Sequence, residues 1–384
     1  MFDNPFTPIF GGKPEFFFGR QALLARFGRS LAVRGGEDRA LFITGTRGMG
    51  KTALVERLSG QARVAGWETI DVSAENALAG LFRHLARFDT KTTTVAPQVS
   101  VTVFGTGGSV GGSGTQNTSH YTLDDLDTLL LERAAAAKAG LFVSIDEVQK
   151  VPLDDISRIC GAVQMASRKG CDIALVVAGL PYAHADIIHH DGCTYMWRCV
   201  HEELGLLSRA EVEGAFVEAF AAIEGLGIAP EALQRLVEAS SGHPYMMQLL
   251  GYHAVEVAGQ NAGGDSYRLT AGDAEAVVPV ALAAYERRSL QPLLDEMGEG
   301  ETGYLRAMAS LMEDARLAAT GDVARAMGRE HRQVAPYRQK LLDAGVIVAP
   351  ARGTVRFNIP YLREFVRKVQ PRDRNERLLD EWDV

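Results

Sequence analysis

The chain lacks the features that mark secreted, membrane or disulfide-stabilised proteins. Its 384 residues contain four cysteines with no C-x-x-C pair and no regular spacing: Cys160, Cys171, Cys193 and Cys199. This argues against a disulfide framework. No apolar run approaches the roughly 20 residues that a membrane-spanning helix needs. The N-terminus also lacks the basic start and apolar block of a signal peptide. We therefore expect a reduced, cytoplasmic protein with no membrane segment.

The composition is that of a globular protein, but its charge is unevenly distributed. Hydrophobic residues make up 46% and charged residues 23%, which excludes disorder and fibrous structure. The length predicts two or three domains. Residues 301–370 hold 12 lysines and arginines against 7 aspartates and glutamates, a net charge of about +5. Since the whole chain carries −8, the remainder carries about −13, and the basic block keeps nucleic-acid binding open.

Strand patterns alternate with helical patterns through the first half of the chain. We expect strands at 39–44, 67–72, 141–145 and 173–178, and helices from about 50 and at 76–88, 122–139 and 154–168. This alternation predicts a parallel α/β sheet. Residues 90–120 are rich in Thr, Gly and Ser and contain an alternating stretch at 98–105. They predict a long loop that carries a hairpin or a strand.

From about residue 208 the patterns are helical, and we expect no further strand before the C-terminal third. Ser208 and Glu211 predict a capping box at the first of these helices. The expected helices lie at 208–223, 230–239, 243–258 and 270–290. Residues 302–369 predict a helix, a short helix, a further helix, two short strands joined at Arg352 and Gly353, and a last helix.

The segment GTRGMGKT matches the phosphate-loop pattern G-x-x-x-x-G-K-[ST], between a predicted strand and a predicted helix. Glycines allow the backbone to wrap around phosphates, and a helix N-terminus presents free N–H groups to an anion. We expect Lys51 to reach the β- and γ-phosphates and the Thr52 hydroxyl to ligate Mg²⁺. The predicted phosphate-binding residues are Gly45, Thr46, Arg47, Gly48, Met49, Gly50, Lys51 and Thr52.

Two carboxylates follow the strand expected at 141–145. Asp146 and Glu147 should lie at the carboxyl edge of the sheet, beside the phosphate loop. We expect Asp146 to hold the metal, directly or through water, and Glu147 to polarise the attacking water as a general base. Strands often end in carboxylates without a catalytic reason, so the prediction depends on the phosphate loop upstream.

These residues together resemble the AAA+ ATPases, and most closely the bacterial and archaeal ATP-binding proteins related to Orc1/Cdc6 initiators and to STAND-type ATPases. The resemblance covers nearly the whole chain, including NPFTPIFGG and FFFGR near the start, VVAGLP (176–181), YMWR (195–198) and GHPYMMQ (242–248). It implies that Phe18, Gly19 and Arg20 lie by the adenine. It also implies that His243 and Pro244 lie in a helical lid near the nucleotide, and that Arg198 stabilises phosphate charge in its own or a neighbouring subunit.

Parts of this resemblance have simpler explanations. The residues around Pro244 are also an ordinary helix start, because proline suits a first helical turn. Arg198 could equally pack on Trp197 or pair with Glu202 or Glu203. Many AAA+ proteins place Asn, Ser or Thr where this chain has Ala178 and Gly179. The polar group that orients the lytic water is therefore missing or comes from elsewhere, which favours slow hydrolysis and a switch.

The pattern of residues 302–369 resembles the winged helix-turn-helix that follows the ATPase core in Orc1/Cdc6-like proteins. Such a unit docks its second helix in the major groove of duplex DNA, and its wing contacts the backbone or minor groove. Pro336 falls within the expected second helix and is expected to mark its first turn. The candidate DNA contacts are Arg329, Arg332, Arg338, Lys340, Arg352 and Arg356. The alternative is a winged helix that contacts protein or inhibits the chain itself.

We therefore expect a P-loop AAA+ nucleotide-binding domain at 1–207, an α-helical lid at 208–298 and a winged helix at 299–370, followed by a charged tail at 371–384. The expected function is an ATP- and Mg²⁺-dependent switch with ATPase activity that associates with duplex DNA. The alternatives are a STAND-like signalling ATPase, whose winged helix makes protein or autoinhibitory contacts, and an ATP-binding module almost without turnover. Assembly into a homo-oligomer or with a partner protein is compatible with each.

Overall fold

The computed structural model describes residues 2–8, 17, 19–86, 125–312 and 317–369. Phe18, the alternating stretch at 98–105 and the tail at 371–384 lie outside the described residues, so the predictions that concern them stay predictions. Among the described helices, none is both long and apolar enough to cross a lipid bilayer.

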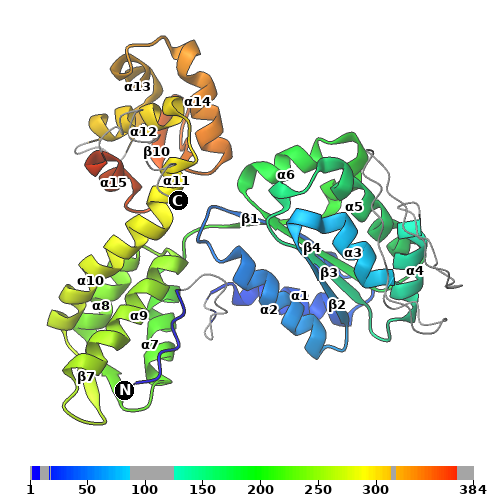
Figure 1. Ribbon diagram of the computed structural model, residues 1–384, viewed down its shortest axis with the longest axis horizontal. Coiled ribbons are helices and arrows are strands. Elements are labelled where there is room, and N and C mark those ends of the chain that lie inside the picture. Colours follow the sequence, from blue (N-terminus) through cyan, green and yellow to red (C-terminus); the bar gives the residue numbers. More distant parts are fainter. Residues whose placement is uncertain (1, 9–16, 18, 87–124, 313–316, 370–384) are drawn as a thin grey trace, which may run out of the picture.

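Five parallel strands form the central sheet, in the order β2-β3-β4-β1-β5 (Figure 1). They span Ala40–Gly45 (β1), Glu68–Val72 (β2), Leu141–Ile145 (β3), Ile173–Gly179 (β4) and Val200–Leu204 (β5). The predicted parallel α/β fold is confirmed. The sequence did not predict β5, because His201, Glu202 and Glu203 interrupt the apolar pattern that marks β1, β3 and β4.

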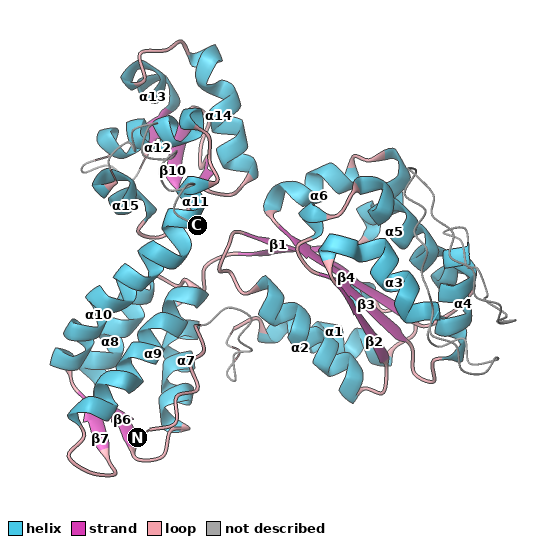
Figure 2. Ribbon diagram, viewed as in Figure 1, coloured by secondary structure: helices cyan, strands magenta, loops and turns pink. Residues whose placement is uncertain are grey.

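Helices cover both faces of this sheet, as Figure 2 shows. One face carries α1 (Gln21–Ala32) and α2 (Lys51–Val64). The other carries α3 (Ala77–Ala86), α4 (Leu126–Ala136), α5 (Leu153–Arg168) and α6 (Pro181–Ile188). Successive residues of a strand point to opposite faces, so Leu41 and Ile43 join the first core and Phe42 joins the second. Burial on both faces explains why β1, β3 and β4 are almost continuously apolar.

The helical unit, residues 208–298, contains the helices that the sequence predicts. They are α7 (Arg209–Ala221), α8 (Pro230–Ser240), α9 (Pro244–Asn261) and α10 (Ala271–Tyr285). A π-helical turn, Glu286–Leu290, extends α10 into α11 (Gln291–Asp295). The expectation of no strand here is wrong, because β6 (Leu226–Ile228) and β7 (Tyr267–Leu269) pair in parallel. Two three-residue strands are too short to produce a recognisable alternation.

The N-terminal segment packs on the helical unit rather than on the sheet. Phe6 is 3% exposed and packs against the rings of Phe216 and Phe220, with centroid distances of 6.2 and 5.5 Å. The backbone N–H of Thr7 donates to Gln248 Oε1 at 3.0 Å. Figure 1 shows this dark-blue segment running beside α7 and α9.

The C-terminal unit, residues 299–369, combines four helices with a small antiparallel sheet of order β8-β10-β9. Its elements are α12 (Glu299–Leu311), β8 (Ala318–Ala319), α13 (Thr320–Ala326), α14 (His331–Asp343), β9 (Ile347–Val348), β10 (Thr354–Phe357) and α15 (Leu362–Lys368). Pro336 does not mark the first turn of α14. A capping box formed by Glu330 and Gln333 starts the helix, and Pro336 lies inside it, where it removes one backbone hydrogen bond.

The helical and C-terminal units share one continuous apolar core. Tyr285 at the end of α10 and Tyr304 of α12 are both fully buried in it. Tyr361 of the C-terminal unit donates through its hydroxyl to the carbonyl of Ala239 in α8 at 2.6 Å. The two units therefore meet through buried side chains as well as through the chain connection.

Candidate active site at the phosphate loop

The loop of residues 45–50 connects β1 to α2 at the carboxyl edge of the sheet. Gly48 and Gly50 adopt φ values of 78° and 84°, a left-handed region that favours glycine. A β-carbon on Gly48 would lie 2.5 Å from Cε1 of His243, so the helical unit approaches the loop too closely for a side chain. Both glycines are therefore required by geometry, although only Gly50 is a fixed glycine of the sequence pattern.

Lys51 lies under this loop and is 6% exposed. Its Nζ donates to the carbonyls of Gly45 at 2.9 Å and Thr46 at 3.1 Å. Burial lowers the pKa of the Lys51 ammonium, and Glu147 and Asp146 oppose that shift. The side chain is thus a pre-positioned cation beside the free N–H groups of the first turn of α2, an arrangement that suits an anion.

The predicted metal ligands lie together. Thr52 Oγ1 donates to Asp146 Oδ2 at 2.5 Å, across the gap between the start of α2 and the end of β3. The other carboxylate oxygen of Asp146 accepts from the backbone N–H of Glu147 at 2.8 Å. Glu147 has φ 54°, in the left-handed region that non-glycine residues seldom adopt. Such strained backbone is concentrated at functional sites.

Sequence reasoning missed Gln149, which contacts the expected general base. Its Nε2 donates to Glu147 Oε2 at 2.7 Å, and its Oε1 accepts from the backbone N–H of Leu180 at 3.2 Å. A β-carbon on Gly179 would lie 2.8 Å from Gln149 Oε1 and 2.7 Å from Val148 Cγ1. Gly179 ends β4, which lies between β1 and β3. The Gln149 amide therefore occupies the space beside Gly179, where many AAA+ proteins have a polar side chain.

His243 connects the helical unit to the loop. It caps α9, with Nδ1 accepting from the backbone N–H of Met246 at 3.4 Å, and Pro244 occupies the first turn. The ring is 1% exposed and lies 5.0 Å from the ring of Tyr285, centroid to centroid. Burial lowers the pKa of His243 to about 4, and the backbone of Arg47 partly offsets this effect. The imidazole is therefore neutral at pH 7.

Gly19 and Arg20 lie where the sheet and the helical unit meet. A β-carbon on Gly19 would lie 2.6 Å from Leu207 Cδ2, and Gly19 has φ 73°. Arg20 Nη2 donates to the carbonyl of Gly205. Burial lowers the pKa of Arg20, while Glu211 at the start of α7 raises it. The segment thus lies between the end of the sheet and the start of α7, and the role beside the adenine that the resemblance implies stays a prediction.

The C-terminal unit also reaches the phosphate loop. A β-carbon on Gly345, just after α14, would lie 2.6 Å from Thr46 Cγ2 and 3.2 Å from Pro181 Cγ. Arg47 forms two hydrogen bonds with Glu296, of 2.7 and 2.6 Å, next to the junction of the helical and C-terminal units. Sequence patterns do not predict either contact, because each joins residues about 250 to 300 positions apart.

Arg198 lies at the opposite edge of the sheet from the phosphate loop. It ends a 3-10 helical segment, η5 (Asp191–Arg198), just before β5, and β5 runs parallel to β1. Among the described residues it has no ion-pair partner, and Glu202 pairs with Arg26 at 3.0 Å. A role for Arg198 in phosphate chemistry stays a prediction, and this position restricts it to the site of a neighbouring subunit.

The six candidate DNA contacts differ in their surroundings. Arg332 is 93% exposed, and Arg352 and Arg356 are also exposed. Arg329 donates to the Tyr337 hydroxyl at 2.9 Å and lies over that ring. Lys340 pairs with Glu301 at 2.9 Å, and Arg338 Nε is buried without a hydrogen-bond partner among the described residues. Arg329 and Lys340 are exposed as well, but their side chains are held by Tyr337 and Glu301. Arg332 makes a longer ion pair with Glu330, at 3.8 Å, and no side-chain interaction of Arg352 or Arg356 is found among the described residues, which favours these three as contacts.

Comparison with known proteins agrees with this geometry. Residues 34–185 match the family model of an AAA domain, and residues 288–366 match a domain of unknown function, DUF8462. The fold is similar to that of the ORC2 protein of Aeropyrum pernix in its ADPNP–ADP complexes, with a TM-score of 0.64, 16% identity, and 95% of this chain and 97% of that chain covered. For the ADP form of the same protein the TM-score is 0.53 and the identity 16%, with 99% of this chain and 97% of that chain covered. The chain thus has the P-loop AAA+ fold, which confirms the predicted resemblance to Orc1/Cdc6-related proteins at the level of the fold.

Two curated mycobacterial proteins are also similar. Each is described as uncharacterized, one from Mycobacterium tuberculosis (strain ATCC 25618 / H37Rv) and one from Mycobacterium bovis (strain ATCC BAA-935 / AF2122/97). Both are 31% identical to this chain over 147 residues, which is 38% of this chain. The chain spans 27% of the length of these relatives.

Proposed function

We propose that the protein is an ATP-dependent switch that hydrolyses ATP slowly and associates with duplex DNA. The observation that carries the nucleotide part is the arrangement of Lys51, Thr52 and Asp146 around the phosphate loop. A buried cation, a hydroxyl and a carboxylate meet at one helix N-terminus. The ORC2 structures with this fold contain ADPNP and ADP, which supports adenine nucleotides as the ligands.

Mg²⁺ fits the residues at this site. The Thr52 hydroxyl and the Asp146 carboxylate lie 2.5 Å apart and are hard oxygen ligands, which Mg²⁺ prefers. These two side chains would hold the ion, directly or through water. When bound, Mg²⁺ neutralises charge on the β- and γ-phosphate oxygens. Lys51 adds a second positive charge from beneath the loop.

Glu147 would act as the general base, with Gln149 as a positioning residue. Glu147 Oε2 accepts from Gln149 Nε2 at 2.7 Å and lies 3.7 Å from Lys150 Nζ. Because Gln149 also accepts from the N–H of Leu180, its amide connects the ends of β3 and β4. The amide would thus fix the direction of the Glu147 carboxylate and supply the polar group that Gly179 cannot.

DNA association would use the C-terminal unit as a winged helix. The order α12, β8, α13, α14, β9 and β10, with Gly353 in the turn between the last two strands, supports this proposal. Arg332 on α14 and Arg352 and Arg356 on the turn and strand are exposed, in the part of the chain with excess positive charge. Salt-dependent attraction to phosphates follows from this charge.

A second candidate function is a signalling ATPase that the C-terminal unit holds closed. It is favoured by the contact of Gly345 with Thr46 and by the paired hydrogen bonds between Arg47 and Glu296. The side chains of Arg47 and Glu296 are 45% and 57% exposed, so their ion pair stabilises the closed arrangement by only about 0–1 kcal/mol. Such a contact can be broken by a modest competing interaction, as a switch requires.

One experiment separates these functions. The ATPase rate and the size-exclusion profile are measured for the full chain, each with and without duplex DNA. The DNA-associated switch predicts a rate that rises with DNA and a complex that elutes earlier. Turnover that DNA does not change, with no complex at low ionic strength, would favour the signalling function instead. Glu147→Gln provides the control for turnover by another enzyme in the preparation.

A further inference from the structure

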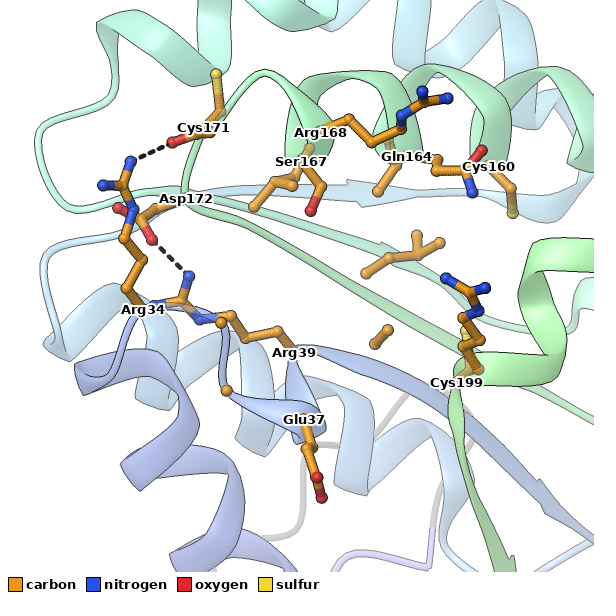
Figure 3. Close-up of a pocket in the computed structure, with 18 of the residues that line it drawn as sticks. Arg34, Glu37, Arg39, Cys160, Gln164, Ser167, Arg168, Cys171, Asp172 and Cys199 are labelled. Carbon is orange, nitrogen blue, oxygen red and sulfur yellow. Dashed lines mark hydrogen bonds and ion pairs between the residues drawn. The ribbon is translucent and has the colours of Figure 1, made fainter.

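A second concave site lies at the amino edge of the sheet, opposite the phosphate loop (Figure 3). It is a cavity of about 650 Å³ between α5, the starts of β1 and β4, the turn after α1, and η5. Small-molecule sites have volumes of roughly 300–1,000 Å³. The residues of the phosphate loop take no part in it, so the proposed ATP site leaves this cavity unexplained.

The floor of the cavity is apolar. Val163 of α5, Ile173 and Leu175 of β4, and Met196 of η5 line it, and each is less than 10% exposed. Apolar walls around a concave space favour a ligand with an apolar body, because its burial removes hydrocarbon surface from water.

The rim of the cavity is cationic. Four arginines and two carboxylates line the site, giving a net charge of +2: Arg34, Arg39, Arg168, Arg198, Glu37 and Asp172. Arg39 and Asp172 neutralise each other through a bond of 2.5 Å, which Figure 3 marks. Within the described ranges, Arg34 donates only to a backbone carbonyl, that of Gly170, at 2.5 Å. Arg168 and Arg198 have no hydrogen bond or ion pair with any residue in the described part of the chain.

We propose that this cavity binds a small organic anion: a phosphate, sulfonate or carboxylate attached to an apolar group. Guanidinium groups recognise such anions through two parallel N–H donors and remain charged at every physiological pH. Arg34 from the turn after α1 and Arg168 from the end of α5 supply this recognition, and Gln164 and Ser167 on α5 add neutral polar groups. The apolar floor takes the rest of the ligand, so inorganic phosphate alone binds more weakly than an anion with an apolar body.

The probe for the test is 1-anilinonaphthalene-8-sulfonate, an aromatic sulfonate, titrated into the full chain by calorimetry in the presence of saturating ATP and Mg²⁺. The variant is the double substitution Arg34→Gln and Arg168→Gln. The matched control is Arg158→Gln, an exposed arginine on the same helix α5 that does not line the cavity. Removal of two charge-assisted hydrogen-bond donors should weaken probe binding about tenfold or more, and the control should bind as wild type does.

Alkylation of Cys171 locates the probe without any substitution. Cys171 lines the cavity and is partly exposed, so iodoacetamide can reach its thiol. The other two cysteines of the lining should react more slowly, because Cys160 is buried and burial raises the pKa of the Cys199 thiol to about 11. The probe should slow alkylation of Cys171 by iodoacetamide in the wild-type chain, as followed by mass spectrometry. Unchanged alkylation at saturating probe would overturn the proposal, as would a double variant that binds as tightly as the control. Lys51→Ala should bind the probe as wild type does, because Lys51 lies at the other edge of the sheet. The test of this cavity therefore does not depend on whether the phosphate loop binds ATP.

Discussion

Gly345 of the C-terminal unit lies directly against Thr46 of the phosphate loop. A β-carbon on residue 345 would come within 2.6 Å of Thr46 Cγ2, and Gly345 has φ 69°. The contact therefore needs both the small size and the left-handed backbone of glycine. Because Thr46 is only 6% exposed, the C-terminal unit helps to bury one side of the loop. Movement of this unit should thus change access to the nucleotide.

Gly345→Ala should loosen this contact and speed nucleotide exchange. Gly353→Ala is a matched control, because Gly353 also has positive φ, 79°, but a β-carbon there would meet nothing within 4 Å. Both substitutions carry a backbone cost of about 1–3 kcal/mol. Only the first adds a clash with the loop. The dissociation rate of a fluorescent ADP analogue, measured by stopped flow, should rise several-fold in Gly345→Ala. Equal rates in the two variants would contradict the closed arrangement.

Gln149→Ala should lower the kcat for ATP and leave KM nearly unchanged, since it removes the group that directs Glu147 but no expected phosphate contact. Loss of a positioned base altogether costs about 10²–10⁴ in rate, so the Gln149→Ala effect should lie below that of Glu147→Gln. Lys150→Ala is the control, because its exposed ion pair with Glu147 at 3.7 Å should contribute little. If both alanine variants had the same kcat, Gln149 would have no positioning role. Gln149→Asn should not restore the rate fully, because its shorter side chain cannot span Glu147 and Leu180.

Replacing Arg332, Arg352 and Arg356 with alanine should weaken DNA binding in a salt-dependent manner. Every arginine–phosphate interaction that the substitutions remove should reduce the slope of log K against log[salt] by about 0.9. Arg235→Ala on α8 is the control, because that arginine pairs with Glu275 outside the C-terminal unit. Fluorescence anisotropy of labelled duplex at several salt concentrations gives the slopes. Identical slopes for wild type and the triple variant would show that these arginines do not contact DNA. The triple variant should still bind ATP as wild type does.

Acid should destabilise the chain partly through His243. Its pKa falls to about 4 on folding, so between about pH 4 and 6.5 the unfolded chain binds a proton that the folded chain does not. Stability contributed by the neutral ring is therefore complete above about pH 6.5 and is lost as the pH falls, by up to about 3 kcal/mol. His243→Asn keeps a capping side chain and does not titrate. The fall in Tm from pH 7.5 to pH 5 should be smaller in His243→Asn. An equal fall in both proteins would show that His243 does not carry the effect.

The parts of the site that are local in sequence could be predicted, and the parts that depend on tertiary contacts could not. The phosphate loop and the pair Asp146 and Glu147 follow strands that are apolar enough to recognise. Gln149 has no sequence signature, because its role arises only when β4 places Gly179 and Leu180 beside it. The contact between Gly345 and Thr46 depends on the packing of separate units. In the fold, β5 was missed because its exposed edge position permits polar residues, whereas the buried β1 does not.

Binding of ATP with Mg²⁺ at Lys51 and the phosphate loop underlies each function proposed for the chain. The most direct test is titration of a fluorescent ATP analogue, with Mg²⁺ present, against wild type and Lys51→Ala. Lys169→Ala serves as a control for an exposed lysine at the opposite edge of the sheet. Wild type and Lys169→Ala should bind the analogue saturably, with competition by unlabelled ATP, and Lys51→Ala should lose binding. Equal affinity in wild type and Lys51→Ala would contradict binding at this loop.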